Sequence, residues 1–225
     1  MNKQKVKSKP VKGRKAPVVK PAQQERSRAT RDTILKVVAE LVMSGKFETA
    51  SVQDIVSASG CSVGAFYGRF SDKTAVLYRF YEQQCADLES QVAELIVPEG
   101  PDSLETQLDA FIEYLVANTI AHAAFLHASR QYFSTAKETA FVQRARLLNG
   151  RLYGQILPLL RARPDEFTHP NAESASLFLL ALIGGLTRDG LLTGAALTNR
   201  KVEAGPFIAE LKRAVFGYLG IVRQA

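Results

Sequence analysis

The 225-residue sequence predicts an all-α fold of about nine helices. Apolar residues recur three or four positions apart along nearly the whole chain, as on the buried face of a helix. No stretch shows the apolar and polar alternation of a half-buried strand. Proline and glycine clusters interrupt this spacing and mark helix ends. Hydrophobic residues make up 46% of the chain, which is enough for a well-buried core in one or two domains.

The first three expected helices follow one another closely. An amphipathic first helix is followed by Gly45-Lys46-Phe47, and its apolar stripe consists of Ile34, Leu35, Val38, Leu41 and Val42. The second helix opens at Thr49-Ala50-Ser51-Val52, and Gly60 breaks it where a tight turn is needed. Ser62 can cap a very short third helix, in which Phe66 points inward.

The remaining helices are longer. One begins near Asp72 and ends at the Pro98-to-Pro101 segment. The others span about 104–115, 121–133, 138–160, 171–192 and 206–222. The run from Ala175 to Leu186 is apolar on nearly every side, and Gly184-Gly185 within it allows another helix to come close.

Residues 51–73 read as two short helices joined by a glycine turn, with basic residues beside an aromatic cluster. This is the pattern of a helix-turn-helix that binds DNA. The outward positions of the second helix are Ser62, Val63, Ala65 and Tyr67, and Gly64 permits a close backbone approach. Such small, mixed side chains suit a major groove about 12 Å wide better than a solvated surface.

The run from Thr30 to Tyr81 resembles the DNA-binding domain of the TetR family of bacterial transcriptional regulators. The helices described above occur in the family's order, and the segment from Tyr67 to Lys73 is similar to the family's Tyr-x-x-Phe-x-x-Lys signature. The sequence departs from the family pattern at Val56, Cys61 and Gly68. The first two departures are packing changes, whereas Gly68 removes a side chain that could touch DNA.

The resemblance implies an N-terminal three-helix helix-turn-helix DNA-binding domain, residues 25–72, followed by a larger helical ligand-binding and dimerisation domain, residues 73–225. It further implies a repressor that leaves a palindromic operator when a small, largely apolar effector binds the second domain. Two alternatives remain. One is a constitutive or architectural DNA-binding protein that uses a basic N-terminal arm. The other is a small-molecule-binding or enzymatic helical protein whose helix-turn-helix is only structural.

The resemblance also carries the family's DNA contacts over to matching positions. The candidate residues, including two arginines that add backbone contacts, are Arg28, Arg31, Ser51, Ser62, Val63, Gly64, Ala65, Tyr67, Arg69 and Lys73. Ser51, Tyr67 and Lys73 resemble phosphate-binding residues, and residues 62–65 resemble the start of the recognition helix. The two serines could instead be only helix caps, Tyr67 a structural aromatic residue, and Arg69 and Lys73 ordinary solvated charges.

Family members hold their effector between the DNA-binding segment and the last helices. Candidate lining residues are Phe111, Phe125, Tyr132 and Arg146. The alternative is that they belong to the core, as an aromatic stripe at helical spacing more often does. The last two helices, about 171–192 and 206–222, would pair with their copies in a homodimer. A dimer that binds two half-sites about 34 Å apart multiplies the modest specificity of a single recognition helix. Effector binding would move the helix that begins near Asp72 and change the spacing of the recognition helices.

The formal net charge of +7 belongs to the N-terminal tail. Residues 1–24 hold eight basic and no acidic residues, which leaves −1 for the rest of the chain. Three prolines and few large apolar residues predict that this arm is disordered in isolation. It could attract phosphates without specificity, or Lys12-Gly13-Arg14-Lys15 could lie in the minor groove beside the operator.

Catalytic and metal-binding patterns are absent from the sequence. His122 and His127 are five positions apart, which puts them about 140° apart on a continuous helix, so they do not share a face. Cys61 and Cys85 lack metal or disulfide spacing and are expected to be buried thiols, with redox sensing as the alternative. HExxH, CxxC, Walker and GxGxxG motifs are missing, so we expect no enzyme and no cofactor.

Membrane and export signals are also absent. The most apolar run, Ala175 to Leu186, is shorter than the roughly 20 residues that span a bilayer. The basic N-terminus lacks the apolar stretch of a signal peptide. We therefore expect a cytoplasmic protein without a membrane partner.

Overall fold

The structure, a computed structural model, describes residues 21–133, 139–192 and 203–221. In these residues it contains nine α-helices, two short 3-10 helices and no strand beyond one isolated bridge, which confirms the expected all-α fold. The helices are α1 (Pro21–Met43), α2 (Val52–Ser59), α3 (Val63–Tyr67), α4 (Lys73–Leu95), α5 (Leu104–Ala121), α6 (Ala123–Ser129), η1 (Arg130–Phe133), α7 (Ala140–Ala162), η2 (Pro164–Glu166), α8 (Ala172–Leu192) and α10 (Ala204–Leu219).

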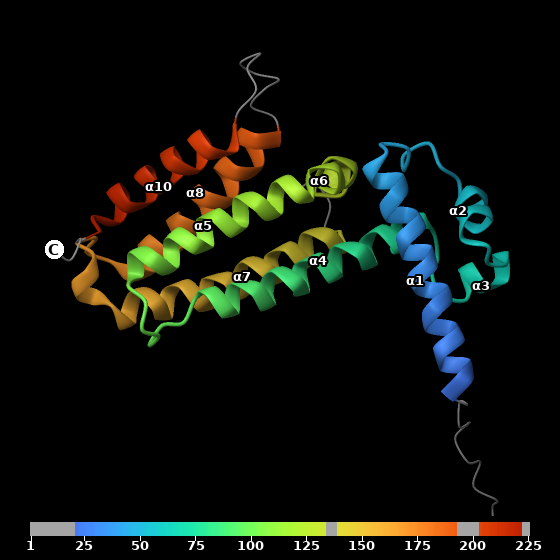
Figure 1. Ribbon diagram of the computed structural model, residues 1–225, viewed down its shortest axis with the longest axis horizontal. Coiled ribbons are helices and arrows are strands. Elements are labelled where there is room, and N and C mark those ends of the chain that lie inside the picture. Colours follow the sequence, from blue (N-terminus) through green and yellow to red (C-terminus); the bar gives the residue numbers. More distant parts are fainter. Residues whose placement is uncertain (1–20, 134–138, 193–202, 222–225) are drawn as a thin grey trace, which may run out of the picture.

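Helices α1, α2 and α3 form a small unit at one end of the molecule, and α4 leads from it into a larger helical body (Figure 1). In the body, α5, α7, α8 and α10 run roughly along the long axis. The short helix α6 lies where the two parts meet, and α1 packs against both α4 and α6. The α1–α3 unit therefore rests on the body through two helices.

Local capping explains where the first helices begin and end. Ser51 and Asp54 form a capping box at the start of α2, and Gly60 ends that helix with a φ of 63°, in the left-handed region that glycine adopts without strain. The side chain of Asp72 accepts a hydrogen bond from the backbone N–H of Ala75 (2.8 Å) and so caps α4. The predicted turn and caps are confirmed.

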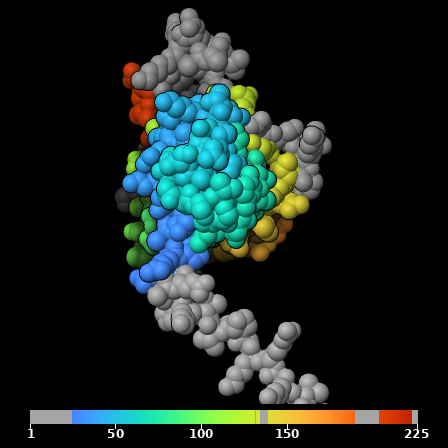
Figure 2. All heavy atoms as spheres, turned by 90° about the vertical axis from the view of Figure 1, so that its right-hand side faces the viewer, coloured from blue at the N-terminus to red at the C-terminus, as the bar shows by residue number. Residues whose placement is uncertain are grey.

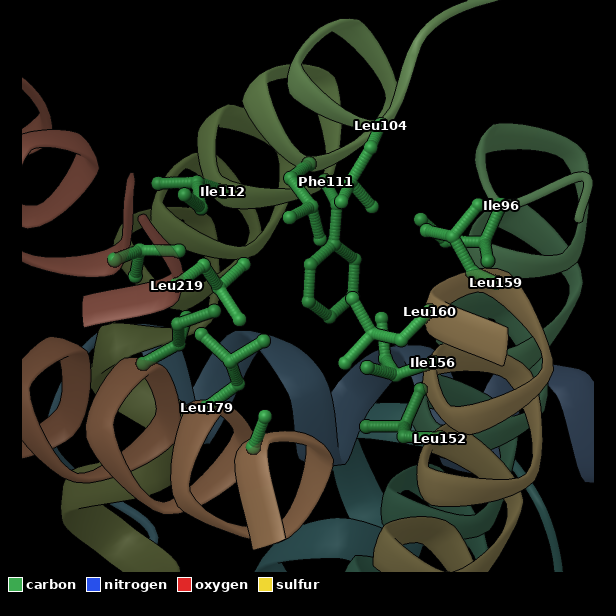
Figure 3. Close-up of a cluster of buried hydrophobic side chains, with 14 of the residues drawn as sticks. Ile96, Leu104, Phe111, Ile112, Leu152, Ile156, Leu159, Leu160, Leu179 and Leu219 are labelled. Carbon is green, nitrogen blue, oxygen red and sulfur yellow. The ribbon is translucent and has the colours of Figure 1, made fainter. Parts of the chain in front are cut away.

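Two hydrophobic clusters make up the core. The body cluster joins α4, α5, α7, α8 and α10 (Figure 3), and each fully buried leucine contributes about 1.5–3 kcal/mol. Its members include Ile96, Leu104, Phe111, Ile112, Leu152, Ile156, Leu159, Leu160, Leu179 and Leu219. The junction cluster joins the α1–α3 unit to α4, α6 and α7. Its members include Ile34, Val38, Phe47, Ile55, Phe66, Phe70, Leu77, Tyr81, Cys85, Phe125 and Phe141.

Several expected boundaries differ from the observed ones. The segment 121–133 is not one helix, because the chain breaks at His122 and continues as α6 and η1. Helix α1 begins at Pro21, so the last four residues of the expected disordered arm are helical, and residues 1–20 lie outside the described part. Across the described ranges, no helix combines the length and apolarity that crossing a membrane requires.

Candidate functional site

Helix α3 is held firmly from the inside and exposed on the outside. Ser62 caps it by accepting a hydrogen bond from the backbone N–H of Ala65 (3.1 Å), and the side chain of Phe66 is fully buried in the junction cluster. The side chains of Val63 and Tyr67 are 46% and 55% exposed. Figure 2 looks onto this end of the molecule, where residues of the α2–α3 segment cover the centre of the view. The arrangement presents an apolar and a phenolic side chain on a fixed helix.

Ser51 is fully engaged as a cap. Its hydroxyl donates a hydrogen bond to a carboxylate oxygen of Asp54 (2.7 Å) and accepts one from the backbone N–H of Asp54 (3.2 Å). Hydrogen bonds from the backbone and side chain of Ser51 lower the pKa of Asp54. The cap interpretation of both serines is therefore supported, and Ser62 lies exposed beside Val63.

Lys73 has a structural task that the sequence did not indicate. Its ammonium donates hydrogen bonds to the carbonyl oxygens of Phe47 (3.1 Å), Glu48 (2.8 Å) and Ala50 (2.9 Å). It also lies 5.1 Å from the centre of the Phe47 ring. All three ammonium protons are thus used inside the protein. Lys73 anchors the start of α4 to the segment between α1 and α2 rather than reaching outward to a phosphate.

Arg69 is likewise turned toward the protein. Its guanidinium donates to the carbonyl oxygen of Ala65 (2.7 Å) and to the carbonyl (3.3 Å) and hydroxyl (3.0 Å) oxygens of Ser27 on α1. Arg31 forms an ion pair with the adjacent Asp32 (2.9 Å), whereas Arg28 is exposed on α1. Arg69 therefore joins α3 to α1 and is neither a solvated charge nor directed at a phosphate.

A cavity of about 300 Å³ lies among α4, α5, α6, η1, α7 and α8. It lies between the two hydrophobic clusters, because its wall includes Leu152 of the body cluster and both Tyr81 and Phe125 of the junction cluster. The rings of Tyr81 and Phe125 stack with centres 5.7 Å apart. Burial raises the pKa of Tyr81, so its hydroxyl stays protonated.

One of the four candidate effector residues lines this cavity. Phe125 does, whereas Phe111 is fully buried in the body cluster. Tyr132 stacks on Phe141, with ring centres 5.1 Å apart, and Arg146 is exposed on α7. These three residues do not line this cavity, and helical spacing does not distinguish a core-facing aromatic residue from one beside a cavity.

None of the four selected residues belongs to the polar wall of the cavity. His122 and His127 both line the cavity, since the helix breaks at His122 and the angle of a continuous helix does not apply. Arg130 and Arg188 line it as well. The basic residues on α6 and late in α8 were the available signal, but it becomes readable only once the helices are assembled.

The two cysteines differ in their surroundings. Cys85 is buried in the cavity wall, and burial raises the pKa of its thiol. Cys61 is only half-buried, and its sulfur accepts a hydrogen bond from the hydroxyl of Ser59 (3.2 Å). The expectation of a buried thiol therefore holds for Cys85 alone.

Helix α8 exposes large apolar side chains. Leu177 is 59% exposed and Phe178 is 47% exposed, and Leu186 near the later end of the helix is 44% exposed. The ring of Phe178 packs on that of Tyr218 from α10, with centres 4.5 Å apart. Helix α8 therefore carries exposed apolar side chains beside its contact with α10.

No protein-family model matches the sequence, and no curated protein matches it. Solved structures do match the fold. A regulatory protein in the TetR family from Rhodococcus RHA1 is 13% identical and superposes with a TM-score of 0.63, covering 86% of this chain and 98% of that one. GusR from Salmonella enterica is 17% identical, with a TM-score of 0.60 over 84% of this chain and 95% of its own.

A transcriptional regulator from Aquifex aeolicus is 20% identical, with a TM-score of 0.55 over 83% of this chain and 97% of that one. These similarities extend over both the α1–α3 unit and the helical body. Together with the capped turn before α3, they identify the architecture: the chain has the fold of the TetR family of transcriptional regulators.

Proposed function

We propose that the protein is a homodimeric, ligand-responsive transcriptional regulator, a repressor that leaves a palindromic operator when an effector occupies the cavity. The observation that carries this proposal is α3, a capped helix with Phe66 buried beneath it and Val63 and Tyr67 exposed on it, in a fold shared with TetR-family regulators. Residues 25–72 serve as the DNA-binding domain and residues 73–225 as the effector-binding and dimerisation domain. Nothing in this role requires catalysis.

Helix α3 enters the major groove in this proposal. Ser62, Val63, Gly64 and Ala65 face the bases, and Val63 contacts thymine methyl groups. Tyr67 contacts a phosphate, and Arg28 adds a second backbone contact from α1. Lys73 and Arg69 act indirectly, because their donors hold α3 and α4 in place.

The exposed apolar side chains on α8 support a homodimer. Exposed Leu177, Phe178 and Leu186 would be covered by the same helices of a second copy, which is the isologous contact of a two-fold dimer. Two copies of α3 would then address two half-sites about one DNA turn apart.

The junction cluster supports a coupling between the cavity and α3. Phe125 on α6 and Tyr81 on α4 line the cavity, and both belong to the cluster that buries Phe66. Lys73 ties the first residue of α4 to the segment that precedes α2. An effector that displaces α4 or α6 would therefore alter the position of the α1–α3 unit and the separation of the two recognition helices.

A binding-site selection from random duplex DNA tests the proposal. The full-length protein should enrich a palindrome with half-sites one helical turn apart. Val63→Thr should change the preferred bases, and Tyr67→Phe should weaken all sequences alike. Lys36→Ala, an exposed charge on α1, is the matched control and should leave the preference unchanged. Failure to enrich any sequence would refute the proposal.

The basic arm separates the proposed function from the architectural alternative. Deletion of residues 2–20 should reduce the salt dependence of binding, since phosphate neutralisation by lysine and arginine sets that slope. The specific complex should survive the deletion. A protein that loses all binding with its arm, and never responds to a ligand, would instead be the constitutive binder.

A further inference from the structure

We propose that the cavity takes an amphipathic organic anion, an apolar body with one terminal carboxylate. This inference rests on the proposed function, since it names the chemical class of the effector. It is carried by the distribution of apolar and basic side chains along the cavity wall.

The apolar part of the wall comes from four different helices. Leu88 of α4, Leu115 of α5, Leu152 of α7 and Leu180 of α8 all line the cavity and belong to or pack against the body cluster. A ligand's apolar body in contact with these side chains would be stabilised in proportion to the surface that it removes from water. A volume of about 300 Å³ is at the small end of ligand sites and suits a compact molecule.

The basic part of the wall comes from α6, η1 and the later ends of α5 and α8. On α8, Leu180, Gly184 and Arg188 are four residues apart and share one face, so Arg188 lies about 12 Å along the axis from Leu180. His122 comes seven positions after Leu115 and caps the later end of α5. The later ends of α5 and α8 both lie on the α6 side of the body (Figure 1). The cavity therefore has an apolar end and a basic end.

Charge at the basic end is not balanced by the wall itself. The described residues that line the cavity include Arg130, Arg188, His122 and His127, and no aspartate or glutamate. The nearby Glu89 is occupied, because it forms ion pairs with Arg144 and Arg151. Guanidinium groups bind carboxylates through two parallel hydrogen bonds, which a neutral or cationic ligand cannot accept in the same way.

The exposure of Arg130 and Arg188 suits a ligand with an apolar body and a charged end. Arg130 and Arg188 are both solvent-accessible, so the carboxylate of a bound ligand would keep partial hydration while its apolar body is enclosed. An anion held in this way avoids most of the cost of burying a charge. A cationic ligand would face two like charges at the same place.

The test is isothermal titration calorimetry of the full-length protein with two matched series. The first series is octanoate, 1-octanol and octylamine, and the second is 4-phenylbutyrate with its alcohol and amine. We expect at least one carboxylate to bind about tenfold or more tightly than its alcohol, with the amine weakest. The double variant Arg130→Gln, Arg188→Gln should lose about tenfold in carboxylate affinity and none in alcohol affinity. Arg161→Gln, an arginine outside the cavity, is the matched control and should bind as the parent does.

Equal or tighter binding of an alcohol or amine would overturn the anionic class, as would no binding of any carboxylate at millimolar concentration. If the double variant kept its affinity for the carboxylate, the carboxylate would not bind at the two arginines, and the proposal would be overturned as well. The proposed function fails separately. If a carboxylate binds and the selected DNA stays bound, the ligand class stands and the release mechanism does not. If only a neutral compound released the DNA, the proposed regulatory function would stand and the anionic class of effector would be refuted.

Discussion

The body cluster and the junction cluster are organised differently. The body cluster is dominated by aliphatic side chains and reaches the cavity at Leu152, whereas its Phe111 is fully enclosed among leucines and isoleucines. The junction cluster is rich in aromatic rings, borders the cavity through Tyr81 and Phe125, and extends to Phe66 beneath α3. The first is built to stay in one arrangement. The second borders the cavity with Tyr81, Cys85 and Phe125, so its side chains have room to repack, which the proposed coupling requires.

The largest expected difference comes from truncating one phenylalanine in each cluster. Phe111→Ala should lower the free energy of unfolding by about 3–5 kcal/mol, because it leaves a void in a closed core. Phe125→Ala should lower the free energy of unfolding by about 1 kcal/mol less than Phe111→Ala does, because the ring of Phe125 already borders the cavity and has fewer contacts to lose. Urea denaturation at one fixed protein concentration measures both values. Equal losses would mean that the junction cluster is as closed as the body cluster.

Replacement of Lys73 tests the anchor between the junction cluster and α4. Lys73→Met should lower the free energy of unfolding by about 2 kcal/mol, because three backbone carbonyl groups lose a charged donor. Lys36→Met on the exposed side of α1 controls for the lost charge and should change stability by less than about 0.5 kcal/mol. Thermal unfolding followed by circular dichroism measures the effect. Unchanged stability with weaker DNA binding would restore the phosphate contact that the sequence suggested.

Replacement of a glycine in the cavity wall should change the free energy of unfolding by less, and should raise it rather than lower it. A Cβ added at Gly184 meets no other atom within 4 Å, so Gly184→Ala should stabilise the protein by about 0.5–1 kcal/mol through helix propensity. Gly154→Ala on α7 is equally unobstructed, lies outside the cavity wall and should give the same gain. Carboxylate affinity should fall for Gly184→Ala alone. A fall for both variants would indicate an effect of stability rather than of cavity space.

The smallest effect concerns the acid stability of the body. Burial alone would raise the pKa of Glu166, but hydrogen bonds from the backbone N–H of Leu104 (2.6 Å) and from Arg163 (2.8 Å) outweigh it and lower the pKa. The stability that the carboxylate contributes is therefore present above its ordinary pKa of 4.5 and is lost as the pH falls through the lowered value.

Glu166→Gln should be less stable than the parent at pH 7, and the two should converge below pH 4.5. Denaturant titrations across this range give the comparison. Glu173→Gln, at an exposed ion pair, should show little difference at any pH. A gap between Glu166→Gln and the parent that persisted in acid would assign the effect to packing.

The helices were predictable from the sequence because their signals are local. Serine, aspartate and glycine at the ends of α2, α3 and α4 act on backbone groups within a few residues, and the apolar spacing of Ile34 or Phe66 needs no tertiary information. The same holds for Gly60 at the turn. Fold class and the helix-turn-helix therefore follow from short-range chemistry.

The site was less predictable because its contacts are distant in sequence. The carbonyl partners of Lys73 lie 23 to 26 residues before it, and Ser27 lies 42 residues before Arg69. Nothing in the local sequence distinguishes these charges from solvated ones. The cavity combines residues from five α-helices and η1, so no single periodic pattern contains it, and Phe111 resembles Phe125 until the packing is known.

The hydrogen bonds between Arg69 and Ser27 also have a kinetic consequence. They fix the first turns of α1 beside α3. The eight basic residues among the first 24 all precede Ser27 in the sequence. Charges tethered there would meet the DNA backbone before α3 docks, which favours rapid capture and sliding along the duplex. The arm would then govern how fast an operator is found, while α3 determines how long the protein stays on it.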